Sequence, residues 1–219
     1  MRIVRSPDPG PFNHYRDYKP HLRPLFRYRC AYCLSHEDFM GRFDAMEVDH
    51  FKPKRRPEFA HLEHEWANLY YCCRRCNQHK SNHWPTDEEA RRGLRFVDPC
   101  AEDPDDHFRL SRHPKHGDFC CVISPTAAGR YTIEKIRLNR DQLVQIRRSI
   151  AAEEREEQAL LSRISQWITS LTAEVESRGP SAEIKQALRG LTREHEQRSA
   201  KLAEIRSLRP FPVEEEFTS

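Results

Sequence analysis

Four cysteines in two closely spaced pairs are the residues of this 219-residue chain whose spacing most directly specifies chemistry. The pairs are Cys30-Ala-Tyr-Cys33 and Cys73-Arg-Arg-Cys76. A Cys-x2-Cys spacing lets two thiolates turn onto one ion, and two such pairs supply the four sulfur ligands that zinc takes in closed structural sites. We therefore expect Cys30, Cys33, Cys73 and Cys76 to hold one structural Zn2+, with the adjoining Cys72 as the substitute ligand.

Disulfide pairing in a secreted protein is the alternative interpretation of the cysteines. The segment from Met1 to Phe12 contains Arg2, Arg5 and three prolines, and it lacks the apolar stretch of a secretory signal peptide. A reducing cytoplasm, where thiols persist, is therefore the expected compartment. The cysteines that lack a second complete ligand set are expected to be small buried residues: Cys100, Cys120 and Cys121.

A second group of polar side chains lies between and beside the cysteine pairs: Asp49, His50, Asn68 and Asn77. A phosphodiester resists hydrolysis because its negative charge repels the nucleophile. A hydrolase therefore needs a base to activate water and a cation to absorb charge on the leaving oxygen. This group could supply both. Taken singly, Asp49 could be a turn residue, Asn68 a backbone cap and Asn77 a companion of the zinc site, but their combination with the cysteines favours a hydrolytic site.

Basic side chains flank this group, and the surplus behind the net charge of +3 lies in the part of the chain that holds the cysteine pairs. Contacts from such residues to phosphates give affinity without sequence information. A solvated charged loop is the alternative. The residues that we expect to contact nucleic acid are Lys52, Lys54, Arg55, Arg56, Arg74, Arg75 and Lys80. Among the neighbouring histidines, His79 is the best alternative metal contact.

The elements that must position these residues can be predicted from composition. Residues 45–51 and 68–72 are enriched in Val, Phe and Tyr, which predicts two short strands. Residues 74–83 are predicted as a short helix that stops before a proline. Asp49 and His50 are sequence neighbours, and neighbours on a regular strand point to opposite faces, so they can converge only if the strand ends or bulges there.

The whole chain divides into five predicted parts. Residues 1–29 form a proline-interrupted packing arm, residues 30–98 a cysteine-bounded domain, and residues 99–132 a loop-rich connector punctuated by Pro and Gly. Residues 133–209 form a helical module, and residues 210–219 a tail. With 37% apolar and 32% charged residues, the core must be thin. No run approaches the roughly 20 apolar residues of a membrane span, so we expect a soluble protein with no membrane partner.

The helical module is rich in Glu, Arg, Gln and Leu, and its apolar residues recur mostly every three or four positions, which predicts two long amphipathic helices. Between them, Arg178-Gly-Pro180-Ser181 supplies a stop and a proline suited to the next first turn, so an antiparallel hairpin is expected. Its apolar stripe is either a partner or dimer interface, or the seam by which the hairpin packs on itself or on the rest of the chain. Acidic residues at 153–157 make a long regular coiled coil imperfect.

In these motifs the chain resembles the HNH endonucleases, which have the ββα-metal fold. The resemblance covers about residues 30–85 and rests on three segments: Glu47-Val-Asp49-His50-Phe-Lys-Pro53, Trp66-Ala-Asn68-Leu69 and Cys73-Arg-Arg-Cys76-Asn77-Gln-His-Lys80. It implies an α+β fold in which a zinc-stabilised ββα-metal nuclease core carries a mainly α-helical C-terminal hairpin.

The resemblance also implies a role for each polar residue. His50 would be the general base, because a neutral histidine can take a proton from the attacking water near neutral pH. Asn68 would orient the His50 ring by hydrogen bonding. Asp49 and Asn77 would hold one divalent ion, and their oxygen ligands favour Mg2+ or Mn2+ over zinc. The catalytic ion would then differ from the structural one.

A narrower resemblance, to the PtuB-type HNH proteins of Septu and retron anti-phage systems, extends further along the chain. The additional segments that carry it are Val97-Asp-Pro-Cys100, Glu102-Asp-Pro104, Tyr131-Thr-Ile133 and Leu138-Asn-Arg140. In that family the nuclease accompanies an ATPase with an ABC-type head, so the resemblance implies an ATPase partner. The usual Ile-Glu-His appears here as Val48-Asp49-His50, which shortens the reach of the carboxylate.

The expected function is therefore a metal-dependent endonuclease that cleaves DNA in anti-phage defence, with RNA as the alternative substrate. Two other classes stay open. One is a non-catalytic zinc-knuckle module that binds nucleic acid or protein. The other is an adaptor whose residues 133–209 alone capture a partner. The same hairpin is the expected contact of a homo-oligomer.

Overall fold

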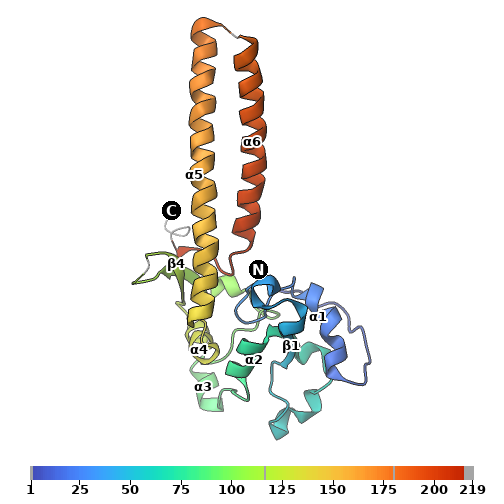
Figure 1. Cartoon of the computed structure of the whole chain (residues 1–219). Coiled ribbons are helices and arrows are strands. Elements are labelled where there is room, and N and C mark those ends of the chain that lie inside the picture. The colour runs from blue at the N-terminus through green and yellow to red at the C-terminus, as the bar shows by residue number, and fades with distance from the viewer. Residues whose placement is uncertain (1, 116, 180, 215–219) are drawn as a thin grey trace. The chain divides into compact units, whose positions relative to one another are not determined.

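The computed structural model describes residues 2–115, 117–179 and 181–214 and separates the chain into two compact units (Figure 1). The first is formed by the chain up to Arg147 together with the segment that begins at Pro210, and the second by Arg148–Arg209. No helix in the described residues is long and apolar enough to cross a membrane.

The first unit is built around a β-hairpin followed directly by a short helix. Strand β1, Met46–His50, pairs antiparallel with β2, Leu69–Cys73, and the register runs from Met46 opposite Cys73 to His50 opposite Leu69. Helix α2, Arg74–Lys80, starts at the next residue. The predicted strands and helix are thus present: the first strand and the helix are shorter than predicted, and the second strand is shifted by one residue. The combination of small strands and helices is consistent with the expected α+β class.

The segment before the cysteines packs on this hairpin. A 3-10 turn at Tyr15–Tyr18 leads into α1, Lys19–Leu25. The helix tolerates Pro20 because backbone N–H groups in the first helical turn have no intrahelical acceptor, so the N–H that proline lacks is not needed there. The Tyr18 ring stacks on Trp66 with centroids 5.5 Å apart, and Phe26 lies 5.5 Å from Tyr70. Large aromatic rings bury much area per residue, which compensates for the low apolar content of the chain.

Residues 99–132, which we expected to be loop-like, contain a second β-hairpin. Strand β3, Arg109–Arg112, pairs antiparallel with β4, Phe119–Ile123, and the register shifts between Ser111 and Arg112. The loop prediction was wrong there because proline and glycine punctuate the turn rather than prevent pairing. Helix α3, Asp87–Arg91, precedes this hairpin and α4, Ala127–Ile136, follows it.

The expected tail is also structured over its described part. The backbone N–H of Leu110 donates to the Pro212 carbonyl at 2.7 Å, and Leu110 forms a parallel bridge with Val213. Phe211 is buried and lies 5.0 Å from the Phe108 ring. Residues beyond Glu214 lie outside the described part of the chain. The segment after the helices therefore extends the second sheet of the first unit.

Two long helices make up the second unit, α5, Asp141–Arg178, and α6, Ala182–Ser207, although the first turns of α5 belong to the first unit (Figure 1). Ser181 caps α6 by accepting a hydrogen bond from the Ile184 N–H, while Pro180 lies outside the described residues. Two of the acidic residues that interrupt the apolar stripe, Glu154 and Glu157, pair across the hairpin. Glu154 accepts hydrogen bonds from Arg206 and Arg209 on the returning chain.

Short 3-10 turns complete the secondary structure in the described residues, at Tyr15–Tyr18, Glu37–Met40, Phe43–Ala45, Pro57–Leu62, Trp66–Asn68 and Pro104–Asp106.

Candidate active site and metal centre

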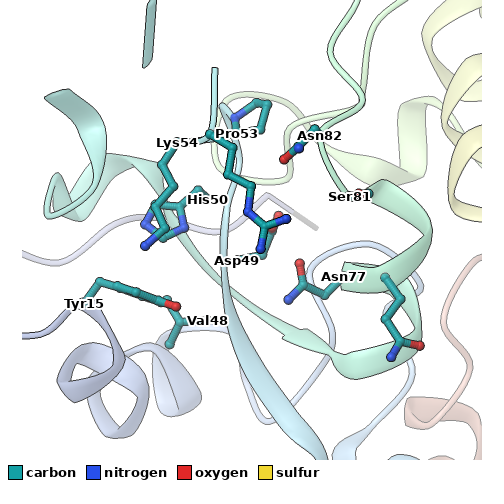
Figure 2. Close-up of a pocket in the computed structure, with 11 residues that line it drawn as sticks. Tyr15, Val48, Asp49, His50, Pro53, Lys54, Asn77, Ser81 and Asn82 are labelled. Atoms are coloured by element: carbon teal, nitrogen blue, oxygen red, sulfur yellow. The ribbon is translucent and has the colours of Figure 1, made fainter. Parts of the chain in front are cut away.

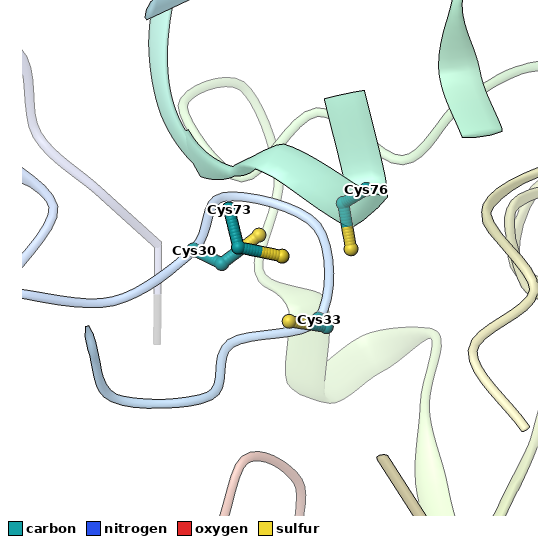
Figure 3. A group of neighbouring side chains, drawn as sticks. All are labelled: Cys30, Cys33, Cys73 and Cys76. Carbon is teal, nitrogen blue, oxygen red and sulfur yellow. The ribbon is translucent and has the colours of Figure 1, made fainter. Parts of the chain in front are cut away.

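The four predicted zinc ligands converge in the first unit (Figure 3). The Sγ atoms of Cys30, Cys33, Cys73 and Cys76 all lie within 4.8 Å of one another, and all four residues are buried. None of them forms a disulfide. A buried set of four thiols at this spacing fits the sulfur coordination of a structural zinc ion. The substitute ligand Cys72 is not part of the cluster, because successive residues of β2 point to opposite faces and Cys73 is the one that faces the other cysteines.

A guanidinium group lies beside this cysteine cluster. Nη2 of Arg140 is 3.3 Å from the Cys76 Sγ and 3.9 Å from the Cys73 Sγ. Burial by itself would lower the pKa of Arg140, but the neighbouring thiolates raise it, so the side chain stays charged. A cation in this place offsets the negative charge of four thiolates around one divalent ion.

Three of the four predicted polar residues line one cavity of about 380 Å3, between the end of β1 and helix α2 (Figure 2). These are Asp49, His50 and Asn77. His50 is the last residue of β1. Because the regular strand ends there, Asp49 and His50 can both face the cavity although neighbours within a strand point to opposite faces. Of the geometries expected for Asp49 and His50, the structure thus shows a strand end, with no register shift in the β1–β2 pair.

His50 is held by the backbone. Its Nε2 lies 2.9 Å from the carbonyl oxygen of Glu63, and because a carbonyl only accepts, Nε2 carries the proton and Nδ1 is left as the acceptor. Burial lowers the pKa of His50, the Glu63 carbonyl opposes that change, and the Lys54 ammonium lowers the pKa further. The imidazole is therefore neutral near pH 7, which is the form that a general base requires.

Asn68 forms no hydrogen bond with the His50 ring among the described residues, which corrects the expected role. Its Nδ2 donates to the Lys52 carbonyl at 3.0 Å and to the Leu62 carbonyl at 3.3 Å, and its Oδ1 accepts from the Lys52 N–H at 2.8 Å. These three bonds close the loop between β1 and β2. The loop carries Glu63, so Asn68 acts on His50 through the position of that carbonyl.

Asp49 is buried and accepts two contacts at the same oxygen. The Tyr32 hydroxyl donates to Oδ2, and the Lys80 ammonium lies 2.9 Å from Oδ2. Within the described part of the chain, Oδ1 accepts no hydrogen bond. One carboxylate oxygen of Asp49 is therefore left for a ligand in the cavity.

Asn77 is oriented by a second carboxylate. Its Nδ2 donates to the Glu47 Oε2 at 2.7 Å, and the Arg74 Nε donates to the Glu47 Oε1 at 3.0 Å. Because the amide nitrogen is engaged, the carbonyl oxygen of Asn77 is the atom available to a cation. Carboxylate and amide oxygens are the ligand types that Mg2+ and Mn2+ prefer.

The basic residues predicted to contact nucleic acid divide into different environments. Lys80 is fully buried and paired with Asp49, so the prediction for it was wrong. Arg56 donates to the carbonyls of Asn82 and Trp84 and thereby holds the loop. Lys54 is half-buried, pairs with the Glu63 side chain and lines the cavity together with the exposed Arg55. Lys52, Arg74 and Arg75 are exposed.

Tyr15 is a cavity residue that sequence reasoning missed. Its ring meets the His50 ring edge-on with centroids 4.7 Å apart, and the Lys54 ammonium lies 3.9 Å from its centroid. Residues 1–29 were expected only to pack. The aromatic and basic composition of that segment was the available signal, but no spacing linked it to the polar residues.

Sequence comparisons found relatives for the region of the chain that contains these residues. Residues 30–83 match the family model of the HNH endonucleases. The Septu protein PtuB of Bacillus thuringiensis is 28% identical over 117 residues, which make up 53% of this chain and 39% of that protein. The chain therefore spans about two fifths of the length of this relative. No solved structure matches the chain significantly.

Proposed function

Because residues 30–83 belong to the HNH endonuclease family, we propose that this protein hydrolyses phosphodiester bonds of DNA with the help of a divalent ion held by Asp49 and Asn77. The single observation that carries the proposal is the state of His50. A neutral imidazole, with Nε2 hydrogen-bonded to the Glu63 carbonyl and Nδ1 left as the acceptor, lines the same cavity as two side chains with oxygen atoms that can ligate a metal ion, Asp49 and Asn77.

Each side chain has a defined task in the proposed reaction. His50 Nδ1 takes a proton from water, whose oxygen attacks the phosphorus while the bond to the leaving sugar oxygen breaks. Asp49 Oδ1 and the Asn77 carbonyl oxygen would hold Mg2+ or Mn2+. When bound, this ion acts as a Lewis acid that stabilises negative charge on the phosphate and leaving oxygens. Arg55 and Lys54 attract the phosphate backbone to the cavity.

The structural ion has a separate task. The cysteine cluster joins the turn at Cys30–Cys33 to the start of α2, and it thereby fixes the helix that carries Asn77 against the strand that carries Asp49. Zinc in closed four-sulfur sites contributes directly to folding free energy. We therefore assign Zn2+ to the cluster and Mg2+ or Mn2+ to the cavity.

The similarity to a Septu protein supports a role in anti-phage defence, as the nuclease partner of an ATPase. This proposal is tested by phage plating efficiency in cells that carry the chain with an ATPase encoded beside it. Protection by the wild-type pair, lost with His50→Ala, is expected. Equal protection by both forms would contradict a role for cleavage.

The helical hairpin supports a second proposal, contact with another copy of the chain. The Trp167 side chain on α5 is 49% exposed, and the apolar residues near the turn of the hairpin are only half-buried. Two helices packed against each other leave part of each apolar face in contact with solvent, and that part can bind a further helix. A mass above that of one chain in light scattering, reduced by Trp167→Ser, is the expected result.

The decisive experiment for the enzyme is plasmid cleavage by wild-type protein and His50→Ala under Mg2+, Mn2+ and EDTA, after zinc content has been checked. Cleavage by wild type alone, abolished by EDTA, is expected. His64→Ala is the matched control, because His64 is an exposed histidine of the same loop and does not line the cavity. It should cleave like wild type.

The other outcomes discriminate between the alternatives. Equal cleavage by wild type and His50→Ala would remove His50 from its role. Cleavage of RNA but not DNA would change the substrate class. Retained DNA binding without cleavage of either nucleic acid, also in the presence of the ATPase, would favour a non-catalytic zinc module.

A further inference from the structure

Both groups that hold Asp49 come from the two segments that hold the cysteine cluster. Tyr32 lies inside the first pair, between Cys30 and Cys33, and its hydroxyl donates to Asp49 Oδ2. Lys80 lies on α2, four residues after Cys76, and its ammonium is 2.9 Å from the same oxygen. Four residues are about one helical turn, so Cys76 and Lys80 project from the same side of α2.

These contacts are buried. The exposed fraction is 2% for Tyr32, 0% for Lys80 and 5% for Asp49. A buried phenol, ammonium or carboxylate without a partner would cost several kcal/mol, so all three depend on this arrangement. Lys80 also donates to the His50 carbonyl at 2.6 Å, which ties the same helix to the backbone of the base.

The two donors fix the rotation of the carboxylate. With Oδ2 engaged by a hydroxyl and an ammonium, Oδ1 is the oxygen that remains for a cation in the cavity. Hydrogen bonds to a charged oxygen are the stronger kind, and partners that orient a metal ligand in this way typically change metal affinity about 10- to 100-fold.

We propose that Tyr32 is a positioning residue for Asp49, and that zinc in the cysteine cluster sets the affinity of the cavity for its divalent ion by holding Tyr32 in place. When zinc binds both Cys30 and Cys33, it fixes the conformation of the turn between them, which contains Tyr32. Loss of zinc frees that turn, and with it the hydroxyl that orients the carboxylate. This inference rests on the proposed function, because it takes Asp49 as a ligand of the hydrolytic ion.

Tyr32→Phe is the sharpest test, because it removes only the hydroxyl and keeps the buried ring. Tyr71→Phe is the matched control. Tyr71 is also fully buried and donates to a carboxylate, that of Glu37, and in the described residues it forms no hydrogen bond with Asp49. Asp49→Asn tests the metal site itself.

The first measurement is Mn2+ affinity of the zinc-loaded full chain by isothermal titration, with one zinc per chain verified for each variant. Tyr32→Phe should weaken Mn2+ binding at least about tenfold, and Tyr71→Phe should leave it unchanged. If Asp49→Asn binds Mn2+ like wild type, the proposed hydrolytic metal site is wrong and the inference falls with it. If Asp49→Asn loses Mn2+ while Tyr32→Phe matches Tyr71→Phe, the positioning role alone is overturned.

The second measurement tests the link to zinc. Coupling between two binding sites is reciprocal, so an ion in the cavity must also favour zinc in the cysteine cluster. Saturating Mg2+ should therefore reduce the fraction of zinc captured by a zinc-selective chelator in wild type, at matched ionic strength, and should do so less in Tyr32→Phe. Capture that is independent of Mg2+ in wild type would overturn the coupling.

Discussion

The Nε2 of His50 lies 2.9 Å from the backbone carbonyl oxygen of Glu63. A side-chain carboxylate could have held the ring, but it would have raised the pKa of the imidazole by its charge. A neutral carbonyl fixes the tautomer at a smaller electrostatic cost. Burial can then keep the pKa of His50 low, and the imidazole stays neutral near pH 7, as the proposed role requires.

The loop that supplies this carbonyl depends on Asn68. Asn68→Ala removes three hydrogen bonds to the backbone of Lys52 and Leu62. These bonds are only partly buried, and each typically contributes about 0.5–1.5 kcal/mol, so the free energy of unfolding should fall by at least about that amount, measured by urea denaturation. The cleavage rate should fall as well, because the Glu63 carbonyl moves. Wild-type stability in the variant would contradict the assigned bonds.

Lys80 is predicted to act in folding rather than in binding nucleic acid. Lys80→Met removes the ammonium and leaves the Asp49 carboxylate buried without its counterion. Breaking a buried pair in this way costs about 3–5 kcal/mol, which should appear as a large drop in the urea midpoint.

Arg75→Met is the control for Lys80→Met, because Arg75 is an exposed cation of the same helix. Its stability should match that of wild type. An unchanged urea midpoint for Lys80→Met, together with weaker DNA binding, would restore the interpretation of Lys80 as a phosphate contact.

Arg140 should determine how firmly the cysteine cluster retains zinc. Arg140→Gln removes the guanidinium that donates to the Cys76 and Cys73 sulfurs. Groups in this position typically change metal affinity about 10- to 100-fold, and zinc transfer to a chelator is therefore expected at a correspondingly lower chelator concentration. Arg137→Gln, at an exposed arginine nearby, should behave like wild type. Equal retention in both variants would show that the sulfur contacts do not matter.

The stability of the hairpin should depend on pH through Glu157. Hydrogen bonds from Lys201 lower the pKa of Glu157, burial opposes that change, and Arg198 lowers the pKa further. A carboxyl whose pKa is lowered by folding stabilises the folded state above its unfolded pKa of 4.5, and this contribution disappears as the pH falls through the lower folded-state pKa.

The measurement is thermal unfolding of wild type and Glu157→Gln, followed by helical circular dichroism between pH 7 and pH 3. The variant should unfold at a lower temperature at pH 7, and the difference should shrink as the pH falls below about 4.5. Glu156→Gln is the control, because Glu156 is exposed. A difference that persists at low pH would point to packing rather than charge.

The cysteine cluster and the β1–β2–α2 unit were predictable because their signals are local. Each Cys-x2-Cys spacing and each short run of strand-forming residues can be recognised from a few consecutive residues. Cys30 and Cys73 are distant in sequence, yet the four-ligand preference of zinc pairs them without any knowledge of the fold.

Lys80 and β3 could not be predicted for a different physical reason. A lysine at the end of a helix looks the same in sequence whether it is solvated or buried, and the burial of Lys80 results from its tertiary position under Asp49. Strand β3 depends on pairing with β4 across a proline- and glycine-containing turn and on Val213 from the far end of the chain. Such non-local pairing leaves little trace in composition.

The segment Pro210–Val213, which bonds to β3, makes the helical hairpin an insertion rather than an appendage. The chain leaves the first unit after Arg147 and returns to it at Pro210, so both ends of the hairpin connect to the first unit. A truncation after Arg147 would therefore remove Phe211 and Val213 from the core, whereas replacing 148–209 by a short linker would keep them.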